Sequence, residues 1–405
     1  MTLVHRWTGL CIAGFLLVAG STGCLLAFLA ELEAWVSPQL MRVALPTSGG
    51  AAPQRLDPLL LRERVQSHYP QAWVHSVDLA APPAGHSLMF FLEGRLDPAT
   101  GRPHELPNDQ VFVDPFTSAI LGERKWGDLG QGGKNLMPFL YRLHYSLALG
   151  TAGSYAFGIA ALLWSLDCVV GAYLTLPARA RRTPGGKPWL ARWWAAWTVR
   201  WGGGAYKLNV DMHRAGGLWL WAMLFVLAWS AVGFNLREVY QPVMRSLFRF
   251  QSLDDALPTL AQEQPIPGLS WARARALGRE HMAAFAKAKQ LTEVEEQALT
   301  YDRGRGLFHY SVRSNRDVSD QGGRTRVVFD ANTGAFLGGH VPTGEASGDT
   351  VVFWLKLLHM AGLGGMPIKL LLCLVGGGVV LLTLSGLIVW RRKRNARAGQ
   401  RRHAR

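Results

Sequence analysis

The chain has 405 residues, of which 49% are hydrophobic and only 18% are charged, whereas ordinary soluble proteins carry about 25% charged residues. This deficit indicates a membrane protein and argues against a soluble enzyme. The net charge of +15 would suggest nucleic-acid binding if it were evenly spread. Instead, seven basic residues lie within 177–212 and eight within 391–405, so no nucleic-acid partner is expected.

Four apolar segments are long enough to cross a bilayer, for which about 20 helical residues suffice. They are roughly 10–29, 155–176, 217–236 and 368–390. We interpret the first as a retained span and not as a cleaved signal peptide, because Ser21 stands where a lipoprotein signal has an aliphatic residue. The basic stretches are predicted to stay in the cytoplasm. Both termini are then inside, and the two long intervening segments are outside.

The predicted fold is a membrane protein with four transmembrane α-helices and two extracytoplasmic α+β domains. Helical spacing covers 59–69 and 271–289, and strands are expected at 87–92, 110–113, 307–312 and 325–329. Tryptophans among arginines in the cytoplasmic loop suit a helix at the lipid headgroups, or alternatively a face that docks a partner. The predicted parts are helix 1 (1–30), outer domain 1 (31–138), helix 2 (139–176), a Trp- and Arg-rich loop (177–209), helix 3 (210–236), outer domain 2 (237–352), helix 4 (353–391) and a basic tail (392–405).

The sequence repeats itself with a period of about half the chain. A His-Arg pair opens the first span at His5 and the third at His213. Residues 113–122 parallel 329–338, and a Leu-His pair leads into the second span at His144 and the fourth at His359. Three matched landmarks in the same order predict a two-fold internal repeat, in which each unit is a helix in, an outer domain and a helix back.

The Asp-x-x-Thr-Gly-type turn within 329–338 resembles the PepSY domain, and the first copy departs from it with Ser118 in place of Gly. Together with the paired spans, it resembles the PepSY-associated transmembrane family, to which iron-regulated membrane proteins and ferric-siderophore reductases belong. The resemblance covers essentially the whole chain. It implies PepSY-like outer domains and a bacterial inner-membrane protein in which the span-end histidines ligate b-type haem.

The four repeat-related histidines His5, His144, His213 and His359 are the candidate ligands of haem iron. Neutral imidazole binds haem iron axially, and two such ligands suit electron transfer because both faces of the iron are filled. Depth groups them into pairs: His5 and His213 begin spans on the cytoplasmic side, while His144 and His359 precede spans that run inward. We therefore expect two bis-histidine haems, one near each face of the membrane.

Small residues follow each histidine at helical spacing. Gly9 and Gly217 come four residues after His5 and His213 and would leave room for a porphyrin on the same helix face. Ala148 and Gly362 stand in similar positions after the other two histidines. Helix–helix packing in membranes also favours small residues, so this pattern has a structural alternative. Breaks in the long second and fourth segments are expected at 150–153 and 362–367.

Cations beside the histidines are candidates for binding haem propionates, although Arg6 and Arg214 also satisfy the positive-inside rule alone. Asp167 is the one acid deep in a span. Intramembrane acids are usually functional, so we expect either a role in proton transfer or at the haem edge, or a pairing with a neighbouring Trp or hydroxyl. The candidate propionate residues are Arg6 and Arg214 inside, and Arg142, Lys356 and Lys369 outside.

No flavin, nicotinamide or nucleotide motif occurs. Electrons are therefore expected from a cytoplasmic reductase or from membrane quinol. The leading hypothesis is an oxidoreductase that passes electrons across the membrane to an extracytoplasmic acceptor, and the family resemblance makes that acceptor a ferric siderophore or another ferric chelate. The alternatives are an iron or siderophore transporter, which the scarcity of intramembrane charges disfavours, and a membrane-anchored regulator of secreted proteases.

Overall fold

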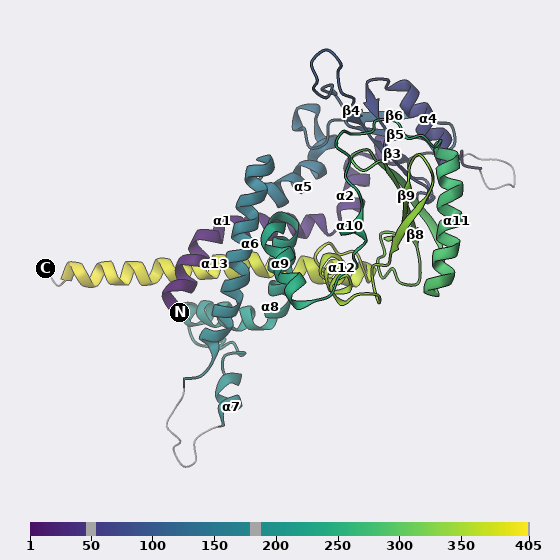
Figure 1. The fold of residues 1–405 in the computed structure, drawn as a ribbon. Helices are drawn as coiled ribbons and strands as arrows, with labels where there is room; N and C mark the ends of the chain where they lie inside the picture. The colour runs from purple at the N-terminus through teal and green to yellow at the C-terminus, as the bar shows by residue number, and fades with distance from the viewer. Residues whose placement is uncertain (46–53, 179–187, 404–405) are drawn as a thin grey trace. The chain divides into compact units, whose positions relative to one another are not determined.

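The computed structural model describes residues 1–45, 54–178 and 188–403. The chain divides into two compact units, which Figure 1 shows as a group of long helices and a region of strands. The helical unit comprises Met1–Phe28, Leu140–Met244 and Leu355–Arg405, and the sheet unit comprises Leu29–Phe139 and Arg245–Trp354. Part of the predicted Trp- and Arg-rich loop, 179–187, and the end of the tail lie outside the described residues.

The helical unit contains four helices that are long and apolar enough to cross a membrane: α1 (Thr2–Leu26), α6 (Gly150–Thr175), α8 (Ala205–Asn235) and α13 (Gly365–His403). Helix α1 packs against α6 and α13, and α8 packs against the same two helices. Large apolar side chains such as Leu166, Trp219 and Leu374 remain exposed on them, as expected of surfaces that face lipid. The chain is therefore a multi-pass membrane protein, as its hydropathy predicts.

Glycine allows the closest approach between these helices. A Cβ atom at Gly20 on α1 would lie 2.9 Å from the carbonyl oxygen of Gly376 on α13, too close for any side chain. Small residues at such positions let transmembrane helices pack backbone to backbone, which replaces the hydrophobic driving force that lipid removes.

Two of the predicted spans are each split into two helices. Helix α5 (Leu136–Ser146) is separated from α6, and α12 (Ser347–His359) from α13, by short turns. The turns contain residues in the left-handed region, Leu147 and Ala148 in one and Ala361 and Gly364 in the other. The predicted breaks thus occur, the first a few residues earlier than expected.

The sheet unit is built from antiparallel strand pairs. Its five-stranded sheet has the order β10 (Phe336–His340), β9 (Thr325–Asp330), β8 (Leu307–Arg313), β7 (Glu295–Asp302) and β2 (Ser76–Asp78). A three-stranded sheet has the order β3 (Leu88–Phe91), β5 (Gln110–Val113) and β6 (Ile120–Arg124), and β1 (Ala72–Trp73) pairs with β4 (Glu93–Gly94). The predicted strands correspond to β3, β5, β8 and β9.

The two segments predicted as separate outer domains share one sheet and one hydrophobic core. Strand β2 of the first segment pairs with β7 of the second, where Ser76 and Thr300 are opposite one another and their hydroxyls are 2.8 Å apart. The core contains Val77 and Phe90 from the first segment and Leu299 from the second, all at most 1% exposed. The sequence could not reveal this because strand pairing between distant segments leaves no local pattern.

The outer-domain helices are fixed by their ends. Helix α4 (Pro58–His68) starts where the Asp57 carboxylate accepts a hydrogen bond from the Leu59 amide at 2.7 Å. Helix α11 (Trp271–Lys289) begins at the Ser270 cap and ends at Gln290, which is left-handed with φ of 53°. Both agree with the helices predicted from apolar spacing. Shorter helices α2 (Leu29–Val36), α3 (Pro38–Met41), α9 (Arg237–Leu247) and α10 (Leu253–Ala256) were not predicted.

The two turns that carry the Asp-x-x-Thr motif adopt the same conformation. In each, the aspartate carboxylate accepts amide hydrogen bonds from the residues two and three positions later, at 2.7 and 3.3 Å for Asp114 and at 2.9 and 2.7 Å for Asp330. The fifth residue of each turn is left-handed, with φ of 64° at Ser118 and 78° at Gly334. Ser118 therefore preserves the turn that glycine forms more easily in the second copy.

Candidate functional site: two histidine pairs

Two pairs of histidines face one another within the helical unit. His5 on α1 lies beside His213 on α8, with ring centroids 6.1 Å apart and ring planes inclined by 58°. His144 on α5 lies beside His359 on α12, with centroids 6.2 Å apart and planes inclined by 74°. The structure brings together the same pairs that the sequence groups by depth.

The separation within each pair fits one metal ion held between two imidazoles. A bond from an imidazole nitrogen to a metal is about 2 Å long, and the nitrogen is ~1 Å from the ring centre, so imidazoles on opposite sides of one ion have centroids roughly 6 Å apart. The separations of 6.1 and 6.2 Å both match this value. The residues present therefore fit a haem iron with one histidine on each face.

Three of the four histidines direct Nδ1 at a hydroxyl on a neighbouring helix. The contacts are Thr22 Oγ1 to His144 at 2.9 Å, Ser230 Oγ to His359 at 2.7 Å and Ser385 Oγ to His213 at 2.9 Å. Each hydroxyl also lies 2.6 to 2.8 Å from a carbonyl oxygen of its own helix, to which it donates its one hydrogen. The hydroxyl oxygen must then accept from the ring N–H, which leaves Nε2 unprotonated and able to bind a metal.

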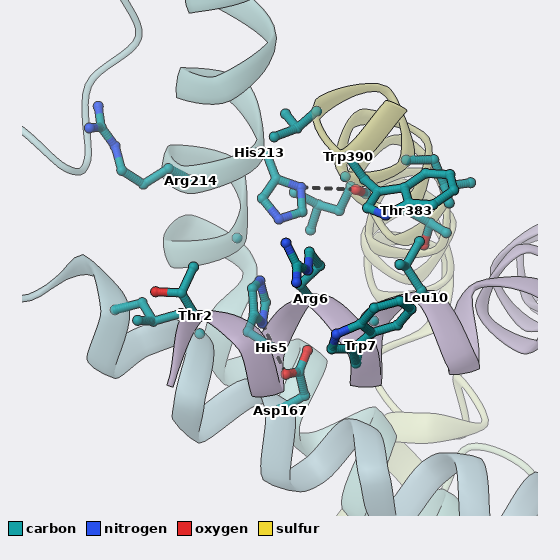
Figure 2. Close-up of a pocket in the computed structure, with 18 of the residues that line it drawn as sticks. Thr2, His5, Arg6, Trp7, Leu10, Asp167, His213, Arg214, Thr383 and Trp390 are labelled. Carbon is teal, nitrogen blue, oxygen red and sulfur yellow. Dashed lines mark hydrogen bonds and ion pairs between the residues drawn. The ribbon is translucent and has the colours of Figure 1, made fainter. Parts of the chain in front are cut away.

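The fourth histidine has a different partner. His5 Nδ1 lies 2.9 Å from Asp167 Oδ1 on α6, and Figure 2 shows the carboxylate below the His5 ring. A carboxylate accepts the ring N–H, so His5 has the same tautomer as the other three. Asp167 therefore pairs with a candidate ligand, and among the described residues no bond joins it to the Trp or the hydroxyl that the sequence left open.

A cavity of about 1200 Å³ is lined by His5, His213 and apolar residues of all four long helices. Ligand pockets in proteins commonly measure about 300–1,000 Å³, so this one has room for a cofactor as large as haem. Gly9 and Gly217 both line it, and a Cβ atom at either would meet nothing within 4 Å. The gap predicted beside these two histidines is present.

The corresponding prediction for the other pair was wrong. Ala148 and Gly362 do not share a helix face with His144 and His359, because α5 ends at Ser146 and α12 ends at His359. The left-handed residues of the intervening turns direct the chain away before a further helical turn can form.

Glycines on neighbouring helices lie against the edges of three of the histidine rings. A Cβ atom at Gly171, Gly386 or Gly23 would lie 3.5, 3.2 or 3.3 Å from the Cε1 atom of His5, His213 or His144, respectively. These positions were missed by sequence reasoning, which considered only the helix that carries each histidine. The signal was nevertheless available, since Gly171 and Gly386 are 215 residues apart, the same separation as His144 and His359.

Arg6 and Arg214 both line the cavity, but they are engaged differently. Arg214 binds the buried Asp211 carboxylate at 2.9 Å and two backbone carbonyls, and Figure 2 shows its guanidinium turned away from the histidines. For Arg6, no ion pair with a carboxylate is found among the described residues, and its guanidinium lies 5.3 Å from the Trp7 ring centroid. Arg6 is therefore the better placed of the two for an anionic group.

Three further cations from the C-terminal end of α13 line the same cavity: Lys393, Arg394 and Arg397. The sequence analysis assigned them to a basic tail because hydropathy ends the fourth span near residue 390. The helix continues to His403, which brings these side chains to the cavity on the face that also carries Trp390.

The cations predicted beside the other pair lie near it in the chain. Arg142 is on α5 and Lys356 is on α12, two and three residues before the respective histidines, while the Lys369 ammonium on α13 lies 6.0 Å from the Phe28 ring centroid. His359 itself packs against Phe234, with ring centroids 5.2 Å apart.

The described part of the Trp-rich loop forms a short helix, α7 (Trp189–Trp194). A chain of aromatic contacts runs from Trp189 through Trp193 and Trp197 to Trp219 on α8, with centroids 5.2 to 5.5 Å apart. Trp194 and Trp201 are exposed. The loop thus presents tryptophan at its surface, while Trp193 contacts Thr175 of α6 and Trp197 contacts Trp219 of α8.

These features define a multi-pass membrane protein with two interhelical histidine pairs and one sheet unit, to which both segments between its spans contribute. The chain belongs to the family described as PepSY-associated TM region, whose model matches residues 2–393, essentially the whole sequence. A comparison with curated proteins gives no match.

Proposed function

We propose that this protein is a di-haem oxidoreductase that carries electrons across a bacterial inner membrane to a ferric chelate, most directly a ferric siderophore, in the periplasm. The observation that carries the proposal is the pair of facing histidines found twice, each with Nδ1 occupied and a separation of 6.1 or 6.2 Å. Two histidine ligands fill both faces of a haem iron and favour electron transfer over oxygen chemistry.

The chain's own residues have defined roles in this proposal. Bound b-type haem supplies an iron that takes up and releases one electron at a time. Each histidine pair would hold one haem, and Asp167, Thr22, Ser230 and Ser385 orient the four rings through Nδ1. Cations that line the cavity would balance the carboxylates of the cofactor, and Arg6 is better suited than Arg214 because it has no carboxylate partner among the described residues.

Matched geometry supports an internal two-fold repeat. The two hydroxyl partners Thr22 and Ser230 are 208 residues apart, as are His5 and His213. The equivalent turns at Asp114 and Asp330 add independent support from the sheet unit. A repeat of this kind would carry one histidine of each pair in each half, so that every haem bridges the two halves.

The proposed orientation places both termini in the cytoplasm and the sheet unit in the periplasm, because Lys and Arg are concentrated in the 177–212 loop and after residue 390. The haem that His5 and His213 would hold is then the one that would accept electrons from a cytoplasmic reductase or from quinol, and the haem that His144 and His359 would hold is the one that would pass them outside. Each ferric ion takes one electron, and reduction to Fe(II) weakens its binding to hard oxygen ligands, which would release the iron.

The test combines spectroscopy with sided vesicles. Purified protein should contain two haems per chain and show a sharp α-band when reduced, while a featureless visible spectrum would refute the proposal. In vesicles, reductant on the cytoplasmic side should reduce an external ferric chelate in the wild type and fail to do so in His213→Ala. If cytoplasm-driven reduction survives in His213→Ala, the protein does not conduct electrons across the membrane by the proposed path.

A further inference from the structure

The four histidines differ in one respect that the repeat does not predict. Three have neutral acceptors at Nδ1, whereas His5 has the carboxylate of Asp167. The residue 215 positions after Asp167 is Leu382, so the second half of the chain has no carboxylate at the matching place. There, the Leu382 carbonyl and the Ser385 hydroxyl accept from His213, at 3.0 and 2.9 Å.

Asp167 is buried within the helical unit, with its carboxylate directed at His5 and its residue 9% exposed. Intramembrane acids are costly to maintain. Among the described residues, the hydrogen bond found for this carboxylate is the one from the His5 ring. The buried Ser165 on the same helix instead bonds its own backbone, at the Ala161 carbonyl 2.9 Å away, so the carboxylate is the side chain of α6 that serves the histidine.

A carboxylate acceptor has a known physical effect on a metal-bound imidazole. It draws the Nδ1 proton toward itself, makes the imidazole a stronger electron donor, and stabilises the more positive oxidation state of the metal. A neutral hydroxyl that already donates to a helix carbonyl does this weakly. The His144–His359 pair has two such hydroxyls, Thr22 and Ser230, and in the part of the chain that the structure describes no carboxylate bonds either Nδ1.

Resting on the proposed function, we propose that Asp167 is a positioning residue that gives the haem held by His5 and His213 a lower midpoint potential than the haem held by His144 and His359. One electron at a time would then pass downhill from the first pair to the second, in the direction of the periplasmic ferric acceptor. The reductant is the cytoplasmic donor or quinol of the proposed function, and the ferric chelate is the species reduced.

The cations that line the cavity act in the opposite sense, because positive charge favours the reduced metal. Arg6 and the α13 cations are expected to be balanced by the two carboxylates of the cofactor, whereas the Asp167 charge acts through the bond from His5 to the metal. Substitution at Asp167 alone, with the cations unchanged, separates the two effects.

The experiment is a spectroelectrochemical titration of the full-length protein with both haems bound. The haem of the first pair is identified as the one lost in His213→Ala. Asp167→Asn keeps an acceptor oxygen of the same size but removes its charge, so it should raise the midpoint potential of that haem and leave the other unchanged. Ser165→Ala, a buried hydroxyl removed from the same helix without contact to a histidine, should move neither potential.

The reciprocal variant Ser230→Asp places a carboxylate opposite His359 and should lower the potential of the other haem. If Asp167→Asn loses the haem of the first pair, Ser230→Asp alone tests whether a carboxylate at Nδ1 lowers the midpoint potential. The inference is overturned if Asp167→Asn retains both haems with unchanged potentials, or if the wild-type haem at His5 and His213 has the higher potential. Wild-type protein without haem would instead refute the proposed function, so the two failures are distinguishable.

Discussion

The pairing of the histidines makes a stoichiometric prediction that double substitutions can test. Each pair is the right width for one iron, at 6.1 and 6.2 Å between ring centroids, so each haem depends on both of its histidines. His5→Ala should lower the haem content from two per chain to one. His5→Ala combined with His213→Ala should also leave one, because the second substitution removes a ligand of a haem that is already lost.

Substitutions that cross the pairs should behave differently. His5→Ala combined with His144→Ala removes one ligand from each haem and should leave none. The expected haem content is therefore one per chain for a double substitution within a pair and zero for one across pairs. The within-pair result is fully non-additive, as double-mutant cycles find for residues in direct contact.

The assay is haem per chain by extraction, together with the absorption spectrum of the reduced protein. His68→Ala, an exposed histidine in the sheet unit, is the matched control and should retain both haems. If the His5–His213 double variant lost both haems while the His5–His144 variant kept one, the haems would connect different histidines and the argument from ring separation would fail. Two haems in all four single variants would end the ligand assignment.

Three further predictions concern the cavity, the sheet unit and the topology. Gly217→Phe should fill the cavity and weaken haem binding at the first pair about tenfold or more, since overpacking costs about 1–3 kcal/mol. Gly377 is equally free of near neighbours but does not line the cavity, so Gly377→Phe should leave haem binding unchanged. Equal losses of haem in the two variants would refute the assignment of this cavity as the haem site. Burial raises the pKa of Glu296, but hydrogen bonds from two arginines and a tyrosine outweigh burial and lower the pKa to about 2 from an ordinary 4.5. The ionised carboxylate therefore contributes stability that is complete above about pH 4.5 and is lost as the pH falls toward 2. Glu296→Gln should remove this pH dependence from the acid-unfolding curve measured by circular dichroism. Reporter fusions near Gly85 and Gly304 should read external, and an internal reading at Gly304 would contradict the two outer segments.

The sequence predicts those features that depend on local pattern. Apolar run length identifies the four spans, and helical spacing predicts α11 with the bounds that the structure shows. The gap beside Gly9 and Gly217 follows from helical periodicity along one helix. The depth of each histidine within its span is also local, because it depends only on distance from the span's end.

Contacts between distant segments could not be predicted in the same way. Asp167 and His5 are 162 residues apart, and Thr22 and His144 are 122 apart, so no spacing rule relates them. The same holds for β2 and β7, whose pairing joins two segments that the sequence treats as separate domains. The α13 cations were missed for another reason: hydropathy marks where a span leaves the bilayer and says nothing of how far the helix continues.

The way the histidines are held links cofactor binding to the packing of the helices. His5 on α1 is held by α6, and its partner His213 on α8 is held by α13. One metal between these two imidazoles would therefore connect all four long helices. The second pair repeats the pattern, since α1 and α8 supply the hydroxyls for His144 and His359. The three hydroxyls are held by bonds to their own helices, and Asp167 is buried between helices. Each of these groups therefore meets its histidine only when the helices are packed together. A helix bundle in lipid gains little stability from the hydrophobic effect, so a metal bound by histidines of different helices would supply part of the stabilisation that the hydrophobic effect gives to soluble proteins. Conversely, the helices must pack correctly before the histidines of a pair can face one another.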